Sequence, residues 1–226
     1  MLIGSGQKWR SIDGWSAGQV GPTFASIDIN GDLYGFGVNY GGLPIFSYEK
    51  EGDQGQGNAF NDFWNEGELF GFTIKTPTKI NLELDKGNNI TSSNIGNRSF
   101  RSRNRNIQNS IPTRVNEVDL GKSFGTLITG QGDLVSWGTN LSSQLGNGQN
   151  QTYRKPFKPP VKFGKLRQIS AGDQQAGMIN NNNQLKLFGS NDQGQLGTGA
   201  PPYNKPLSMT SNWEGIDLDK VKDFVV

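Results

Sequence analysis

Short apolar segments with turn residues at both ends recur along this chain and determine its expected secondary structure. The segments Leu33–Phe36, Leu134–Trp137 and Leu185–Phe188 each begin with leucine and contain residues that favour strands. Each follows a turn signal, of which Asn30-Gly31 is the strongest, and each is followed at once by glycine. This alternation of strand and turn predicts an all-β protein built from antiparallel hairpins.

The pattern returns at a nearly constant interval. The glycines that follow the strands are Gly37, Gly138 and Gly189, so the last two are 51 positions apart (189 − 138) and the first two are 101 apart (138 − 37). A fixed period near 50 residues is typical of repeat architectures, in which each unit buries an apolar face against its neighbour. We therefore interpret the chain as a repeat protein.

Three further positions of the repeat have clear structural roles. Gly138 stands where a strand bends or where a neighbouring backbone comes close. The Asn140 side chain can bond its own backbone and fix the next turn. Leu145 and Leu196 are then placed to fill the space between neighbouring units. All of these roles concern the scaffold and none concerns chemistry.

The repeat resembles that of the regulator of chromosome condensation family. Two further features of that family occur here: a strand that ends in glycine, at Val115–Gly121 and Lys165–Gly172, and a proline at the start of the next unit, as at Pro112, Pro160 and Pro206. The resemblance implies a β-propeller of about three to four blades whose ring is incomplete as given, where complete members have about seven. Members also often carry a histidine after the strand-ending glycine, and this chain has no histidine.

We expect a single partial propeller over residues 1–226. Blade-like units are predicted at about 8–45, 111–160 and 161–210, with insertions at about 46–76 and 81–110 and the opening strand of a further blade at 216–226. The basic, proline-containing stretch Tyr153–Lys165 is expected to be an exposed crossing between two blades.

Residues 70–110 fit the repeat poorly. Phe70–Lys75 and Ile80–Asp85 are each long enough for a strand and predict a hairpin across the turn residues between them. Gly87 falls 50 after Gly37 (87 − 37), which favours a fourth, degenerate blade. The alternative is one long insertion, with Pro77–Ile80 closing the first blade.

Two stretches are candidates for partner binding. An acidic stretch within residues 46–76 contains interleaved aromatic residues, and an arginine-rich stretch follows near residue 100. Loops on a rigid scaffold often carry recognition, and buried aromatic and arginine side chains anchor interfaces. The alternatives are that both stretches are solvated surface, or that the arginines hold phosphate or a nucleic-acid backbone. The predicted partner-binding residues are Phe60, Phe63, Trp64, Arg98, Arg101, Arg103 and Arg105.

Composition narrows the chemistry. The chain has neither histidine nor cysteine, which excludes a Ser-His-Asp set, a Cys-His pair and any histidine- or thiolate-ligated metal. The carboxylates, lysines and hydroxyls that remain form no recognisable catalytic arrangement, so we predict that the protein is not an enzyme and has no cofactor. The sequence Asp28–Asp32 faintly resembles a calcium loop, but it lacks the downstream glutamate and a hairpin turn explains it, so no metal site is predicted.

The charge balance and hydropathy bear on partners and location. The net charge is +2, from 22 basic and 20 acidic side chains, which does not favour nucleic acid as a partner. No apolar run of membrane-spanning length and no signal peptide is found, so we expect a soluble protein with no membrane partner, and a small-molecule ligand is not favoured.

These observations favour a structural and interaction role. We expect a propeller arc that acts as a protein–protein scaffold in a larger assembly, for which a virion is one setting, with other protein subunits or further copies of itself completing the ring. The alternative, implied by the family resemblance, is guanine-nucleotide exchange or chromatin-type regulation.

Overall fold

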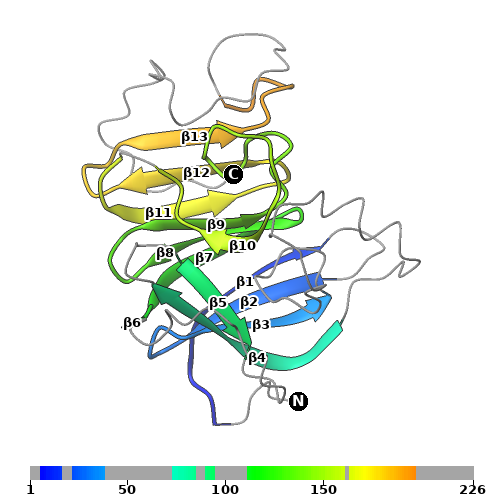
Figure 1. Cartoon of the computed structure of the whole chain (residues 1–226), viewed down its shortest axis with the longest axis vertical. Helices are drawn as coiled ribbons and strands as arrows, with labels where there is room; N and C mark the ends of the chain where they lie inside the picture. The colour runs from blue at the N-terminus through cyan, green and yellow to red at the C-terminus, as the bar shows by residue number, and fades with distance from the viewer. Residues whose placement is uncertain are drawn as a thin grey trace, which may run out of the picture.

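The computed structural model describes residues 6–16, 22–38, 73–84, 90–94, 111–160 and 163–196, and all regular structure there is β-sheet. The strands form three antiparallel sheets, which follow one another in chain order and stack along the long axis of the molecule (Figure 1). The first strands of successive sheets lie next to each other. This arrangement is an arc of a β-propeller, and the predicted fold class is confirmed.

Each sheet is one blade, and we name them blade 1, blade 2 and blade 3 in chain order. Blade 1 runs in the order β1-β2-β3-β4-β5, with β6 also paired to β4. Its strands are β1 (Trp9–Ser16), β2 (Pro22–Asp28), β3 (Leu33–Val38), β4 (Thr73–Leu84), β5 (Ile90–Asn94) and β6 (Ile111–Pro112).

Blade 2 and blade 3 repeat the same meander in a shorter form. Blade 2 has the order β10-β9-β8-β7, and blade 3 has β11-β12-β13. Their strands are β7 (Val115–Gly121), β8 (Phe124–Thr129), β9 (Leu134–Gly138), β10 (Tyr153–Phe157), β11 (Leu166–Ala171), β12 (Gln175–Asn180) and β13 (Leu185–Gly189).

The turn between the second and third strand of each blade is stabilised by the same kind of hydrogen bond from backbone amides to a side chain. In blade 1, Oδ1 of Asp28 accepts hydrogen bonds from the amides of Asn30 and Asp32, both at 2.9 Å. Asn180 accepts from two turn amides in the same way in blade 3, and Thr129 does so through its hydroxyl in blade 2. Short polar side chains that bond nearby backbone favour such turns. The stretch that resembled a calcium loop is therefore a hairpin turn.

The glycine after the third strand is required by its backbone conformation. Gly37, Gly138 and Gly189 have φ values of 96°, 101° and 114°, a region that side-chain-bearing residues rarely adopt. A Cβ on Gly138 would also collide with the carbonyl oxygen of Ser123. The predicted close approach of neighbouring backbone at Gly138 is confirmed.

The loop after this glycine repeats almost atom for atom. The side chain of Asn140 accepts a hydrogen bond from the Leu145 amide at 2.9 Å, and Asn191 accepts from the Leu196 amide at the same distance. Leu145 and Leu196 are thereby held in place, with exposed fractions of 0% and 1%. Both the turn-fixing asparagine and the buried leucine are as the sequence predicted.

Two apolar clusters form the core, one at each junction between blades. The first joins Ala25 and Leu33 of blade 1 to Val118, Val135 and Trp137 of blade 2. The second joins blade 2 to blade 3 and includes Phe124, Leu134, Leu145, Ile169 and Phe188. Because these clusters lie between adjacent blades, much of the stability of the arc comes from the contacts between neighbouring blades.

Two local predictions are wrong. Residues 73–84 form one continuous strand rather than a hairpin, because β4 pairs with β3 through Ile80 and Leu33 on one edge and with β5 on the other. Thr78–Ile80 therefore closes blade 1, and β5 extends the same sheet. Tyr153–Phe157 is likewise not a crossing between blades but the outer strand of blade 2, paired to β9.

Candidate functional site

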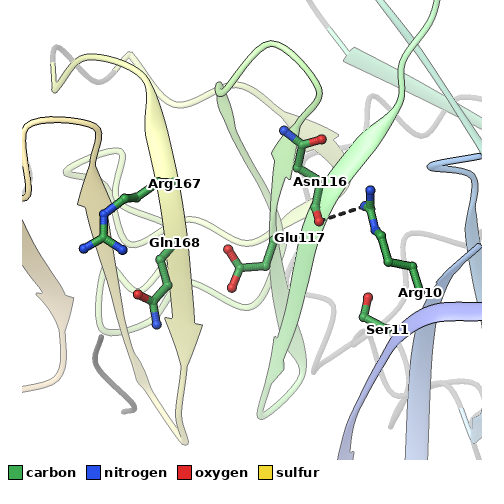
Figure 2. Close-up of a pocket in the computed structure, with 6 residues that line it drawn as sticks. All are labelled: Arg10, Ser11, Asn116, Glu117, Arg167 and Gln168. Carbon is green, nitrogen blue, oxygen red and sulfur yellow. Dashed lines mark hydrogen bonds between the residues drawn. The ribbon is translucent and has the colours of Figure 1, made fainter. Parts of the chain in front are cut away.

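The first strands β1, β7 and β11 lie side by side and carry polar residues at two equivalent positions of the repeat (Figure 2). A hollow of about 470 Å³ lies along this wall. It is lined by Arg10 and Ser11 of blade 1, Asn116 and Glu117 of blade 2, and Arg167 and Gln168 of blade 3. We call it the channel hollow.

Long side chains in the channel hollow bind the backbone of the adjacent blade. Arg10 donates from Nη2 to the carbonyl oxygen of Asn116 at 2.8 Å (Figure 2) and to that of Val115 at 2.5 Å. Glu117 accepts from the Ile169 amide at 3.2 Å. Charged hydrogen bonds to backbone are stronger than neutral ones. These contacts therefore fix the angle between blades as well as making the wall polar.

A second layer of acidic side chains repeats the contact one step further along the strands. Asp13 accepts a hydrogen bond from the Leu120 amide at 2.8 Å, and Asp119 accepts from the Ala171 amide at 2.9 Å. Asp13 and Asp119 occupy the same position of the repeat, as do Leu120 and Ala171. In blade 3 this position is Ser170. The two internal junctions are thus joined by the same carboxylate–amide bond.

The Asp119 carboxyl is held in an unusual protonation state by its surroundings. Its partial burial, the negative charge of Asp13 and a hydrogen bond to the Asp13 side chain raise the pKa of Asp119 from 3.8 to about 7, although amide donors oppose the shift. Desolvation and a like charge both disfavour ionisation. At neutral pH the Asp119 carboxyl group is therefore protonated for a substantial part of the time.

The wall offers several kinds of hydrogen-bonding group. The channel hollow presents guanidinium, amide, hydroxyl and carboxylate groups, a set suited to hydrogen bonding with another polar surface. Within the described ranges, no group of three His, Cys, Asp or Glu residues is placed to hold a metal ion. No helix in the described part of the chain is long and apolar enough to cross a membrane.

Blade 1 also exposes an apolar position that is buried in blades 2 and 3. Ile12 is 62% exposed, whereas Val118 and Ile169 at the same position of the repeat are 6% and 3% exposed. Val118 and Ile169 pack toward the preceding blade. No blade built from described residues precedes blade 1, so Ile12 projects from a face that is constructed like an interface.

Aromatic side chains continue this face across blade 1. The positions of Val135 and Trp137, which pack toward the preceding blade in blade 2, are held by Tyr34 and Phe36 in blade 1. The Trp9 and Tyr34 rings meet edge to face with centroids 5.1 Å apart, and Phe36 stacks on Phe24 at the same distance. We call the surface formed by these four aromatic residues and Ile12 the incoming face.

The seven predicted partner-binding residues lie outside the described residues. They are Phe60, Phe63, Trp64, Arg98, Arg101, Arg103 and Arg105. Sequence reasoning did not find the channel hollow or the incoming face. An alignment of the first strands could have indicated both surfaces. It places Arg10 and Arg167 at one position, and Ile12, Val118 and Ile169 at another.

Comparison with known families agrees with the repeated geometry. Residues 131–179, which run from the β8–β9 turn into β12, match the family model described as the regulator of chromosome condensation (RCC1) repeat. The predicted resemblance to this repeat is thereby confirmed for these residues. They comprise the third and fourth strands of blade 2, with the loop between them, and the first hairpin of blade 3.

Relatives carry the repeat within larger proteins. The E3 ubiquitin-protein ligase HERC2 of Homo sapiens is 25% identical over 118 residues, which are 52% of this chain but 2% of that protein. The crystal structure of human WBSCR16 is similar with a TM-score of 0.50 and 16% identity, over 89% of this chain and 38% of that one. The structure of Prp20p from Saccharomyces cerevisiae, described with its binding to Gsp1p and histones, has a TM-score of 0.37 and 19% identity over 77% and 43% of the two chains.

This chain spans less than half of WBSCR16 and a small fraction of HERC2. The propeller fold is consistent with a protein-interaction or regulatory module. The described residues provide no positive sign of catalysis. The ligase activity in the name of HERC2 is therefore a property of that protein and is not assigned to this chain.

Proposed function

We propose that this chain is a non-enzymatic protein–protein scaffold, a rigid propeller arc that is completed within a larger assembly. The observation that carries the proposal is the exposure of Ile12, at 62%, in a position that the next two blades bury. Exposed apolar patches on a folded domain mark interaction sites. The arc itself is held by carboxylate–amide bonds at both junctions, so it can present this surface without rearranging.

The channel hollow and the two predicted stretches supply further contact area in this proposal. Arg10 and Glu117 already bond neighbouring backbone, so a partner would meet polar groups that are fixed in advance. Such preorganisation lowers the entropic cost of binding. Residues 46–76 and 98–105 carry opposite charges and remain the predicted partner loops.

The test is purification of the protein from the cells that express it, under native conditions. We expect a partner in fixed stoichiometry, with residues 46–76 or 98–105 protected from proteolysis in the complex and cleaved in the isolated chain. The proposal fails if the chain is recovered as a stable monomer with both stretches equally sensitive to protease. The virion setting stays a prediction, which the identity of the co-purified partner would decide.

Guanine-nucleotide exchange is the second candidate, and the repeat at residues 131–179 favours it. Prp20p is described as binding Gsp1p and histones. If this chain works in that way, it will accelerate release of a labelled guanine nucleotide from a small GTPase. The scaffold proposal expects no acceleration, so the same assay separates the two.

A further inference from the structure

Three basic residues lie next to the β2–β3 turn of blade 1, where blade 1 meets blade 2. The amide of Ile29 in this turn donates to the carbonyl oxygen of Lys8 at 3.1 Å. A Cβ on Gly31 of the same turn would lie 3.2 Å from Cβ of Arg114. Arg10 bonds the carbonyl oxygens of the two residues that follow Arg114. We call the surface formed by Lys8, Arg10, Arg114 and Ile29 the basic turn patch.

The positive charge of the basic turn patch is not neutralised by the described residues. Its three basic residues are exposed, and within the part of the chain that the structure describes none of them forms an ion pair. The nearby carboxylates have other partners. Asp28 is buried and accepts from turn amides, and Asp32 pairs with Lys79 at 2.5 Å. Glu117 of the channel hollow accepts from the Ile169 amide.

The junction between blades 2 and 3 shows how the same position can be neutralised within the chain. Lys165 precedes β11 as Arg114 precedes β7, and it pairs with Asp133 of the β8–β9 turn at 2.8 Å. The equivalent pair at the first junction would join Arg114 to Asp32, but Asp32 is bound to Lys79. The basic turn patch therefore lacks a carboxylate that the repeat supplies at the next junction.

The patch also contains an exposed apolar residue. Ile29 is 60% exposed, and the equivalent turn positions in blades 2 and 3 are Gly130 and Asn181. The turn therefore forms without an apolar side chain at this position, and packing within the chain does not account for Ile29. Cations without carboxylate partners, next to an exposed apolar side chain, are complementary to an acidic segment that carries an apolar residue.

We infer that the basic turn patch binds an acidic peptide segment of a partner protein, with carboxylates on the three basic side chains and an apolar side chain against Ile29. This inference rests on the proposed scaffold function and names the chemistry of its partner. Ile29 favours a peptide over nucleic acid, because a phosphate backbone gains nothing from an apolar contact and the patch includes no aromatic ring on which a base could stack. Arg10 retains donors for the ligand, because a guanidinium has five N–H groups and only Nη2 bonds described backbone.

Selection from a random peptide library tests the inference without assuming a particular ligand. A phage-displayed library of short peptides is selected against the immobilised full chain. We expect the recovered peptides to be rich in aspartate and glutamate and to contain an aliphatic residue. Fluorescence polarisation of a labelled recovered peptide then measures its affinity for the wild-type chain and for variants, and binding should weaken as salt is added.

Neutral variants locate the binding site. Lys8→Gln and Arg114→Gln should each weaken peptide binding roughly threefold, and the double variant roughly tenfold, because each removes one exposed charge contact. Ile29→Asn, which places the residue type of the blade 3 turn at this position, should weaken binding roughly threefold through the lost apolar contact. Lys75→Gln is the matched control and should change nothing, because Lys75 is exposed in β4 of the same blade but lies opposite the end of β3, away from the turn. Arg10 is not varied, because it also joins the two blades.

The remaining outcomes each contradict the inference, once near-ultraviolet circular dichroism has shown that the variants are folded. It is overturned if no acidic peptide is recovered, or if the double variant binds the peptide as tightly as the wild-type chain. Equal binding of oligothymidylate, unaffected by Ile29→Asn, would show a general site for polyanions. Tighter binding of a synthetic peptide of residues 46–68 would assign the patch to the acidic stretch of this chain instead. If a protein that co-purifies with the chain is not displaced by the peptide, the scaffold function stands and only the acidic segment is excluded.

Discussion

The acidic pair at the junction between blades 1 and 2 makes the stability of this protein depend on pH in an unusual direction. Asp119 of β7 faces the carboxyl group of Asp13 of β1, with the amides of Ala171 and Leu120 as its other partners. Its pKa is raised from 3.8 to about 7. The folded protein therefore retains a proton that the unfolded chain has released between these two pH values.

The sign and size of the effect follow from this difference. Stability falls as pH rises wherever the folded state binds more protons than the unfolded state. At 1.36 kcal/mol per pKa unit, the shift from 3.8 to about 7 corresponds to a loss of up to about 4 kcal/mol across that window. About 3 kcal/mol of the loss falls between pH 5 and pH 8, because half of the Asp119 carboxyl groups still hold their proton at pH 7. Above about pH 8 this contribution is constant.

Asp119→Asn removes the titrating group and keeps the shape of the side chain. The amide oxygen can still accept from Ala171, and the amide nitrogen can donate to the carboxylate of Asp13. We therefore expect the variant to be more stable than the wild-type protein at pH 8, and the difference between them to be about 3 kcal/mol smaller at pH 5. The variant should retain only the pH dependence of the other groups.

Urea unfolding followed by tryptophan fluorescence at pH 5, 6, 7 and 8 measures the difference. Trp137 is 1% exposed in the apolar cluster at the same junction and reports its opening. Asp173→Asn is the control, because this carboxylate is exposed and forms a surface pair with Lys122, so its substitution should change little at any pH. An Asp119→Asn variant that is less stable than wild type at pH 8, or a difference that does not vary with pH, would refute the reasoning.

Three further substitutions test the scaffold by the same unfolding measurement. Gly138→Ala should cost about 3 kcal/mol or more, because it places a side chain at a φ of 101° against the carbonyl of Ser123; a cost below 1 kcal/mol would contradict this. Asn140→Ala should cost about 3 kcal/mol, because it leaves the buried Leu145 amide without its acceptor, and a near-neutral result would mean that the turn is held otherwise. Asp133→Asn should cost about 1 kcal/mol or less at pH 7, and the cost should be smaller in high salt, because the two lysines that pair with Asp133 are partly exposed. Burial opposes ionisation of Asp133, but the hydrogen bonds and charges of these lysines outweigh burial and lower its pKa. The stabilisation by Asp133 should therefore be lost as pH falls below the usual aspartate range.

The repeat allowed much of the scaffold to be predicted from sequence. Its turns, its positive-φ glycines and its buried leucines depend on local geometry that only a few residue types satisfy, so the same letters recur at Gly138, Asn140 and Leu145 and again 51 positions later. Backbone conformations that only a few residue types can adopt can therefore be predicted from a single sequence.

Long-range pairing was harder to predict. Phe70–Lys75 and Ile80–Asp85 were expected to form a hairpin because the proline and threonines between them resemble a turn, yet pairing with β3 on one edge and β5 on the other keeps β4 extended. Pro77 lies at the register shift of the β3–β4 pairing and outside the residues of β4 that pair with β5, so its missing amide can be accommodated. Pro156 lies in β10, an outer strand, where proline is also tolerated. In both cases tertiary context decided between two conformations that the local sequence permits.

The surfaces argued to be functional were not visible as motifs, because their meaning lies in a difference between equivalent positions. Ile12, Val118 and Ile169 are interchangeable residues in sequence, and each is a normal apolar residue of a first strand. Only their exposed fractions, 62% against 6% and 3%, separate an interface that is filled from one that is not. In a repeat protein the scaffold is what the units share. The binding surface is therefore best sought where one unit lacks the neighbour for which its residues are built.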